Sequence, residues 1–117
     1  IDCFLHKKLR DFVLEDPFLI FSYRYRRAKP SIYLFDLACQ QVTNRGLAPE
    51  QVLYVGNDMR NDICPAAAAG MQTALFAGDA RSLRLRQTDP DCRNLSANLV
   101  VTELMQLPAL IQPPGKR

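Results

Sequence analysis

Residues 52–62 read VLYVGNDMRND, a short apolar run that ends at Gly56 and is followed by two acids and two amides. The run at 52–55 has the β-branched and aromatic composition of a buried strand. An alanine-rich stretch at 62–69, closed by Gly70, predicts a helix packed near a sheet, with Pro65 in its first turn. A strand that enters a helix through a polar turn is typical of an α/β fold.

The same alternation continues on both sides of this stretch. Short apolar runs at 18–21, 73–76 and 98–101 predict three more strands, and helical spacing at 32–42 and 103–111 predicts two more helices. Strands that alternate with helices pair in parallel, so the predicted fold is a doubly wound, Rossmann-like α/β sheet with flanking helices. We expect one domain over residues 1–112 and a C-terminal tail at 113–117.

Composition restricts the function classes. A chain of 117 residues with 48% hydrophobic and 23% charged residues is expected to form one soluble domain. Its net charge is +3, and the basic residues gather at 24–29 and 81–86, which favours a small anionic partner over nucleic acid. The sequence has neither a membrane-length apolar run nor a Cys-x-x-Cys pair, so we expect free thiols, no membrane partner and a cytoplasmic location.

The acids that follow the 52–55 strand allow two interpretations. Asp58 and Asp62 are four residues apart on a turn that leads into a helix, so their carboxylates can converge on a hard cation such as Mg²⁺. Asn57 and Asn61 would then orient its water ligands. In the other interpretation, the two acids cap the helix and its dipole.

Lys29 favours the first interpretation. It lies in the segment AKPS, directly before the predicted helix at 32–42. In parallel sheets, ligands bind beyond the carboxyl ends of the strands, where a lysine can neutralise a phosphoryl group. An isolated lysine before a proline is, however, usually solvated.

Taken together with their surrounding segments, these residues resemble part of a known protein family. The segments SYRYRRAKPSIYLF (22–35), VGNDMRNDICPAAAAGM (55–71) and TALFAGD (73–79) resemble the C-terminal half of a haloacid dehalogenase-like (HAD) hydrolase. The similarity runs from about residue 12 to residue 107. It implies a Mg²⁺-dependent phosphatase that acts on a small phosphorylated metabolite through an aspartyl-phosphate.

The resemblance also assigns roles to residues. It implies that Lys29 stabilises the phosphoryl group and the aspartyl nucleophile, and that Asp58 and Asp62 help to hold Mg²⁺. Asn57 is a further candidate metal ligand, because many family members have Gly-Asp where this chain has Gly56-Asn57. Candidate substrate-binding residues are Ser22 and Arg27.

One part of the family pattern is missing. The family's nucleophile lies in an Asp-x-Asp segment after an N-terminal strand, and the chain has no such segment in that position. We therefore expect the chain alone to be inactive, because loss of a nucleophile costs many orders of magnitude in rate. The family's first two strands are also missing, so upstream residues, a new pairing, a homo-oligomer or strand exchange would have to close the sheet.

Two other function classes share these features. The first is a non-catalytic binding or regulatory protein that retains the HAD-like fold. The second is a phosphate-receiving signalling domain, which is disfavoured because receivers place their lysine after the acids and here Lys29 precedes them. Dehalogenation is also disfavoured, because the acid pair suggests a metal that this branch of the family does not use.

Overall fold

The computed structural model describes residues 22–111. Within them a three-stranded parallel sheet has the order β1-β2-β3, with β1 at Leu53–Gly56, β2 at Gln72–Phe76 and β3 at Leu99–Val101. This arrangement confirms the predicted parallel α/β fold. The strand predicted at 18–21 and the tail at 113–117 lie outside the described residues.

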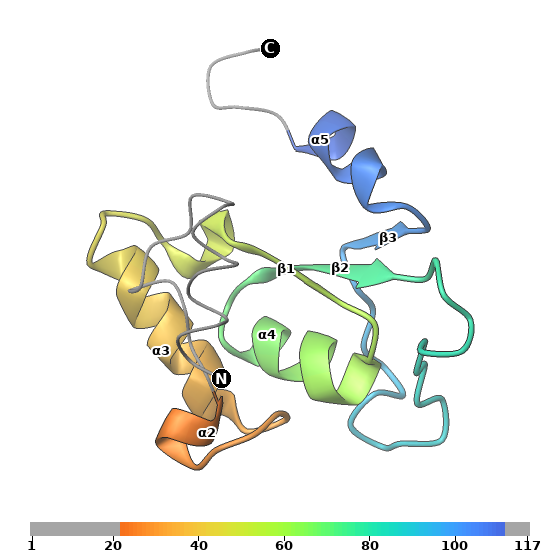
Figure 1. Cartoon of the computed structure of the whole chain (residues 1–117), viewed down its shortest axis with the longest axis horizontal. Helices are drawn as coiled ribbons and strands as arrows, with labels where there is room; N and C mark the ends of the chain where they lie inside the picture. Colours follow the sequence, from red (N-terminus) through yellow and green to blue (C-terminus); the bar gives the residue numbers. More distant parts are fainter. Residues whose placement is uncertain (1–21, 112–117) are drawn as a thin grey trace.

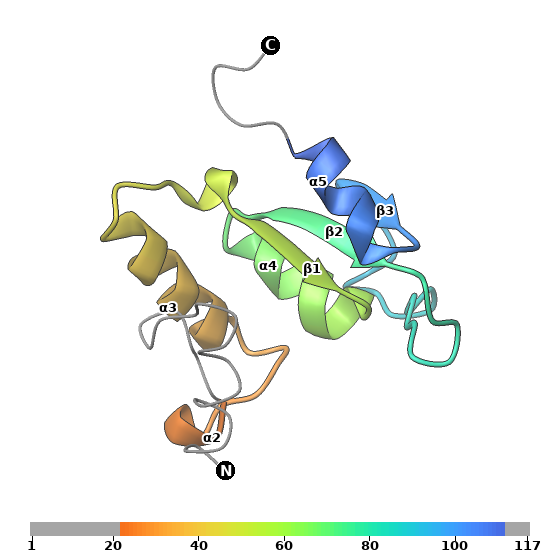
Figure 2. The ribbon, with the colours of Figure 1, turned by 45° about the horizontal axis from the view of Figure 1, so that its top comes forward.

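Helices surround this sheet. The longest described helix is α3 at Ile32–Thr43, and α4 spans Cys64–Ala68; Figure 1 shows α4 below the sheet and α3 to the left of α4. Figure 2 shows α5, at Leu107–Leu110, beside β3 on the side away from α4. The remaining helical segments are short: α2 (Ser22–Tyr25), η2 (Pro49–Gln51), the π-helix η3 (Met59–Ile63) and η4 (Leu104–Gln106).

Helix α3 confirms the helix predicted at 32–42 and extends it by one residue. The hydroxyl of Ser31 accepts a hydrogen bond from the Tyr33 N–H and caps the first turn. The helix ends before Gly46, whose φ of +82° is accessible to glycine at little cost. These local signals explain why its bounds could be read from the sequence.

Two apolar clusters join the helices to the sheet. Phe35, Ala66 and Met71 are buried together between α3, α4 and the start of β2. Met59, Ile63, Leu75 and Cys92 form the second cluster, which packs η3 and the long connection after β2 against the sheet. The second cluster therefore fixes η3, the element that carries the acids.

Two predicted helices differ from the structure. The helix predicted at 62–69 begins earlier, as the π-helix η3, in which the Cys64 N–H bonds to the Met59 carbonyl before α4 continues to Ala68. Pro65 lies in the first turn of α4, as expected. The helix predicted at 103–111 is wrong as a single helix, because it is divided into η4 and α5 near Pro108, which lacks an N–H and favours a new first turn.

Candidate functional site

A shallow pocket of about 300 Å³ lies at the carboxyl end of β1. This is the location that the parallel topology predicts for a ligand. Its lining comes from the turn before α3, from β1 and η3, and from residues near the ends of β2 and β3. The lining residues are Lys29, Tyr54, Val55, Gly56, Asn57, Asp62, Phe76 and Leu104.

Asp62 is the buried acid of this pocket, with 3% of its surface exposed. Its Oδ2 accepts hydrogen bonds of 3.2 Å from the backbone N–H groups of both Asn57 and Asp58. Its Oδ1 accepts a 3.4 Å hydrogen bond from the Tyr54 hydroxyl and pairs with the Lys29 ammonium. Four donors therefore fix the orientation of this carboxylate.

Gly56 allows the backbone to approach Asp62 this closely. A Cβ at position 56 would lie 2.4 Å from the Cβ of Asp62, well inside van der Waals contact. Any residue larger than glycine would displace either the strand end or the acid. The glycine that closes the strand in the sequence is thus a packing requirement of the pocket.

Lys29 reaches the pocket from the turn before α3, where the Ser31 N–H bonds to the Ala28 carbonyl at 2.9 Å. Its side chain is 45% exposed. Partial burial acts to lower the pKa of Lys29, but its hydrogen bond to Asp62 and the nearby Tyr54 outweigh burial and raise it. Burial also raises the pKa of Tyr54. Lys29 therefore remains a cation next to the pocket at neutral pH.

Asp58 has a different environment from Asp62. It is the N-cap of η3, in extended backbone geometry, and its Oδ1 accepts hydrogen bonds from the N–H groups of Arg60 and Asn61 at 3.0 and 3.2 Å. The side-chain amide of Asn61 donates to its Oδ2 at 3.1 Å. The interpretation of Asp58 as a helix cap is thus confirmed.

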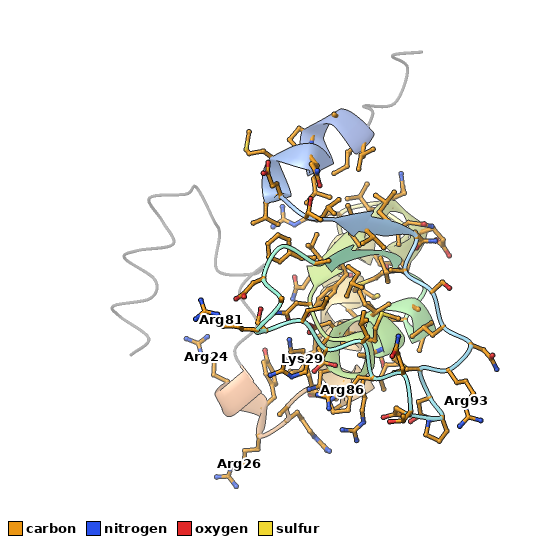
Figure 3. The ribbon with its side chains drawn as sticks, turned by 90° about the vertical axis from the view of Figure 1, so that its right-hand side faces the viewer. Arg24, Arg26, Lys29, Arg81, Arg86 and Arg93 are labelled. Atoms are coloured by element: carbon orange, nitrogen blue, oxygen red, sulfur yellow. The ribbon has the colours of Figure 1, made fainter. Side chains whose placement is uncertain are left out.

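Arg86 completes the environment of Asp58. Its guanidinium binds both carboxylate oxygens, with Nε 3.1 Å from Oδ1 and Nη2 2.7 Å from Oδ2. This hydrogen-bonded pair lowers the pKa of Asp58 to about 2, against the opposing effect of burial. In Figure 3 both Arg86 and Lys29 point toward the middle of the molecule, whereas the other labelled arginines, Arg24, Arg26, Arg81 and Arg93, point outward.

The two acids therefore have separate sets of protein donors in this structure. Between residues 22 and 111 there is no group of three His, Cys, Asp or Glu side chains that could hold a metal. Each carboxylate has its acceptor positions filled by protein donors, which for Asp62 include Lys29 and Tyr54. Asn57 lines the pocket, and no hydrogen bond among the described residues engages its side-chain amide.

Of the candidate substrate-binding residues, Ser22 is the first residue of α2, and its side chain lies outside what the structure describes. The Arg27 guanidinium lies over the Tyr33 ring at 5.4 Å from its centroid, and Arg27 is not among the residues that line the pocket. Sequence analysis did not single out Tyr54, although a tyrosine within an apolar strand two residues before the closing glycine was a signal that could have been followed.

The arginines after β2 divide into two kinds. Arg81 pairs with Asp79 at 3.8 Å on the surface, and the Arg84 guanidinium donates to carbonyls of its own segment. Arg86 instead crosses to the buried Asp58. Nothing in the sequence distinguished Arg86 from Arg81 and Arg84. The free state expected for the cysteines is confirmed for Cys39, Cys64 and Cys92.

Comparison with known proteins gives one match. A family model described as HAD-hydrolase-like matches residues 26–105, which include Lys29, both acids and all three strands. No curated protein and no solved structure matches the chain significantly. Over the part of the chain that the structure describes, no helix combines the length and apolar character needed to cross a bilayer.

Proposed function

Because the chain belongs to the HAD-hydrolase-like family, we propose that it forms the C-terminal portion of a Mg²⁺-dependent phosphatase that acts on a small phosphorylated metabolite. The observation that carries this proposal is the pairing of Lys29 with Asp62 in the pocket at the carboxyl end of β1. These residues come from segments 33 positions apart, and the fold brings a fixed acid and a cation to one open pocket.

Lys29 has the properties needed to bind a phosphoryl group. Its raised pKa keeps the ammonium charged, and its partly exposed side chain leaves donors available to an incoming anion. An ammonium acts on phosphoryl oxygens as a point charge and stabilises the negative charge of the transition state. Asp62 and the Tyr54 hydroxyl hold the lysine side chain at the pocket between catalytic cycles.

A magnesium ion fits the pocket residues as a partial set of ligands. Mg²⁺ commonly takes one or two protein carboxylates and completes its shell with waters and substrate phosphate. Asn57 offers a side-chain oxygen at the pocket wall, and Asp62 offers Oδ1 when Lys29 turns from it toward a phosphate. When bound, the metal would neutralise phosphate charge. Asp58, whose two oxygens are both bound by the Arg86 guanidinium, fits this role less well.

The proposed reaction passes through an aspartyl-phosphate, which requires an aspartate free to attack phosphorus. Both acids near the pocket are held by several donors and serve as support. We therefore expect the 117-residue chain by itself to have no appreciable phosphatase activity. A turnover assay of the chain with p-nitrophenyl phosphate and Mg²⁺ is expected to give no signal above the buffer rate.

Phosphate binding tests the proposal directly. Inorganic phosphate titrated into ¹⁵N-labelled chain with Mg²⁺ present is expected to shift the amide signals around residues 28–31 and 56–62. Lys29→Met, which keeps most of the side-chain volume and removes the charge, should weaken binding at least about tenfold. Arg45→Met is the control, because Arg45 follows the far end of α3. Equal binding by the Lys29→Met chain would refute the proposal.

One observation favours a second function, that of a non-catalytic binding or regulatory protein. The first polar residue after Gly56 is the neutral Asn57, and both nearby carboxylates already have protein partners. A protein of this kind binds phosphate through Lys29 without needing a metal. Phosphate affinity that stays the same when Mg²⁺ is removed would favour this function over the phosphatase.

A further inference from the structure

We propose that Arg86 is a positioning residue, which holds Asp58 so that the backbone N–H groups of Asn57 and Asp58 keep Asp62 at the pocket. The inference rests on the proposed function only in taking this pocket as the site. It assigns Asp58 to a structural latch with Arg86 rather than to the metal. We use the term latch for the contacts between residues 57–60 and residues 84–89.

The latch begins with backbone pairing. The Arg84 N–H donates to the Asn57 carbonyl, and the Met59 N–H donates to the Arg84 carbonyl, both at 2.9 Å. These two hydrogen bonds flank Asp58 on either side. The segment after β2 therefore adds a short parallel bridge to the strand end that carries the pocket amides.

Two ion pairs with opposite polarity close the latch. Asp58 binds Arg86, and Arg60 approaches Asp89 with Nε 3.4 Å from Oδ2. Each of the two segments thus contributes one acid and one base. Such reciprocal charges favour a single alignment of the segments, because a shift would bring like charges together.

The backbone conformation of Arg86 indicates that its contact with Asp58 is specific. Its φ of +54° lies in the left-handed region, which residues with side chains adopt infrequently and at some cost. The side chain is only 35% exposed, and its fork matches both oxygens of Asp58. The contact with the Asp58 carboxylate offsets the backbone cost.

The latch reaches the pocket through two amides. The N–H groups of Asn57 and Asp58 both donate to Oδ2 of Asp62, and they belong to the residues that the latch holds. Loss of Arg86 would leave the buried Asp58 carboxylate without its countercharge. The strand end would then open locally, and Asp62 would lose two of its four donors.

The opposite interpretation makes Arg86 a competitor of the metal for Asp58. The two interpretations predict different changes in Mg²⁺ affinity for Arg86→Gln. If Asp58 were a metal ligand blocked by Arg86, Arg86→Gln would free it and raise the affinity for Mg²⁺. If Arg86 positions the pocket, the same substitution lowers that affinity or leaves it unchanged.

Native-state hydrogen exchange of the full chain tests the latch without metal or substrate. In Arg86→Gln, the Asn57 and Asp58 amides are expected to exchange about tenfold faster or more, given the usual strength of hydrogen bonds to charged groups. The Gln72 and Ala77 amides, which bond to neighbouring strands, serve as internal references for global unfolding. They are expected to change less than the two pocket amides.

Two further variants separate local from general effects. Arg84→Gln is the matched control, because its guanidinium bonds only within its own segment in the described contacts, and less than about threefold change is expected. Arg86→Lys retains the charge but not the two-point contact, so it should give an intermediate rate. If Arg86→Gln does not fold, the comparison of Arg86→Lys with Arg84→Gln replaces it.

The proposal is overturned if the Asn57 and Asp58 amides accelerate no more than the reference amides, or if Arg84→Gln accelerates them equally. A gain in Mg²⁺ affinity in Arg86→Gln, measured by calorimetry, would also overturn it. Failure of the parent chain to bind Mg²⁺ and phosphate would instead refute the proposed function. In that case the exchange result still decides whether the latch exists.

Discussion

Asp58 and Asp62 lie four residues apart, yet the structure uses them in opposite ways. Asp62 faces the pocket, where it is fixed by backbone amides and by close packing against Gly56. Asp58 faces the segment after β2, where it is fixed by the charge of Arg86. The pocket side thus combines close packing with several hydrogen-bond donors, whereas the latch side depends mainly on the charge pair with Arg86.

The backbone geometry of the two residues accounts for this difference. Side chains at i and i+4 share a face only when both residues are helical. Asp58 precedes η3 with φ of −128° and ψ of 116°, so its side chain turns back onto the N–H groups of the first turn. The helical spacing rule does not apply to a residue in the N-cap position.

The largest change in stability is expected for Gly56→Ala, a substitution on the pocket side. The new methyl group would overlap Asp62, so we expect a loss of about 3 kcal/mol in unfolding free energy, typical of overpacking. Gly46→Ala is the control, because that site has open space and only the backbone cost of about 1–2 kcal/mol at positive φ. Urea denaturation measures both.

A Gly56→Ala chain as stable as Gly46→Ala would contradict the assignment of close packing to the pocket side. In that case the acid would have room to move, and the description of Asp62 as fixed in part by close packing would be wrong.

The next largest effect is the pH dependence of stability that comes from the Asp58 carboxylate on the latch side. Asp58 has a pKa of about 2 in the folded chain and an ordinary value of 3.8, so its contribution is present above the ordinary pKa and lost as pH falls toward 2. The shift corresponds to on the order of 2 kcal/mol. Unfolding free energies measured in urea at pH 5, 4 and 3 should reveal this loss.

Arg86→Gln supplies the comparison for the pH series. Without the guanidinium, the pKa of Asp58 should move closer to its ordinary value, and the stability lost between pH 5 and 3 should become smaller. Arg86 makes its carboxylate hydrogen bonds to Asp58, so the difference between the two curves reports mainly this pair. Identical pH profiles would show that Arg86 does not stabilise the Asp58 carboxylate.

The smallest effect is expected for Tyr54→Phe. The hydroxyl donates to Asp62 over 3.4 Å, and the ring packs against Phe35 at 4.9 Å between centroids, a contact that phenylalanine preserves. We expect a loss of at most about 1 kcal/mol in stability. A thermal melt of parent and variant checks this, and a loss as large as that of Gly56→Ala would mean that the hydroxyl, not the glycine, fixes Asp62.

Much of the fold could be predicted from the sequence, because the signals were local. The strands at 52–55, 73–76 and 98–101 and the helix at 32–42 follow from apolar runs, helical spacing and a glycine stop, and each lies within a residue or two of its predicted bounds. Parallel pairing then followed from the alternation of these elements. The π-helix was missed, because its wider turn has no separate signature in the residues at 59–63.

The candidate site was only partly predictable. The meeting of Lys29 with Asp62 was correctly expected, because both lie where a parallel sheet gathers its loops. The pairing of Asp58 with Arg86 joins residues 28 positions apart through an irregular connection, and neither periodicity nor turn chemistry specifies such a contact. The sequence therefore suggested one shared role for both acids and gave no indication that Asp58 pairs with Arg86.

The most direct test compares the two acids in one binding experiment. Mg²⁺-dependent binding of inorganic phosphate is measured by calorimetry for the parent chain, Asp62→Asn and Asp58→Asn. Both substitutions keep the side-chain shape and remove one charge. We predict that Asp62→Asn loses detectable binding, whereas Asp58→Asn retains it within about tenfold, as expected for a residue that supports the site indirectly. Equal loss in the two variants, or a greater loss in Asp58→Asn, would contradict the division of the two acids between pocket and latch.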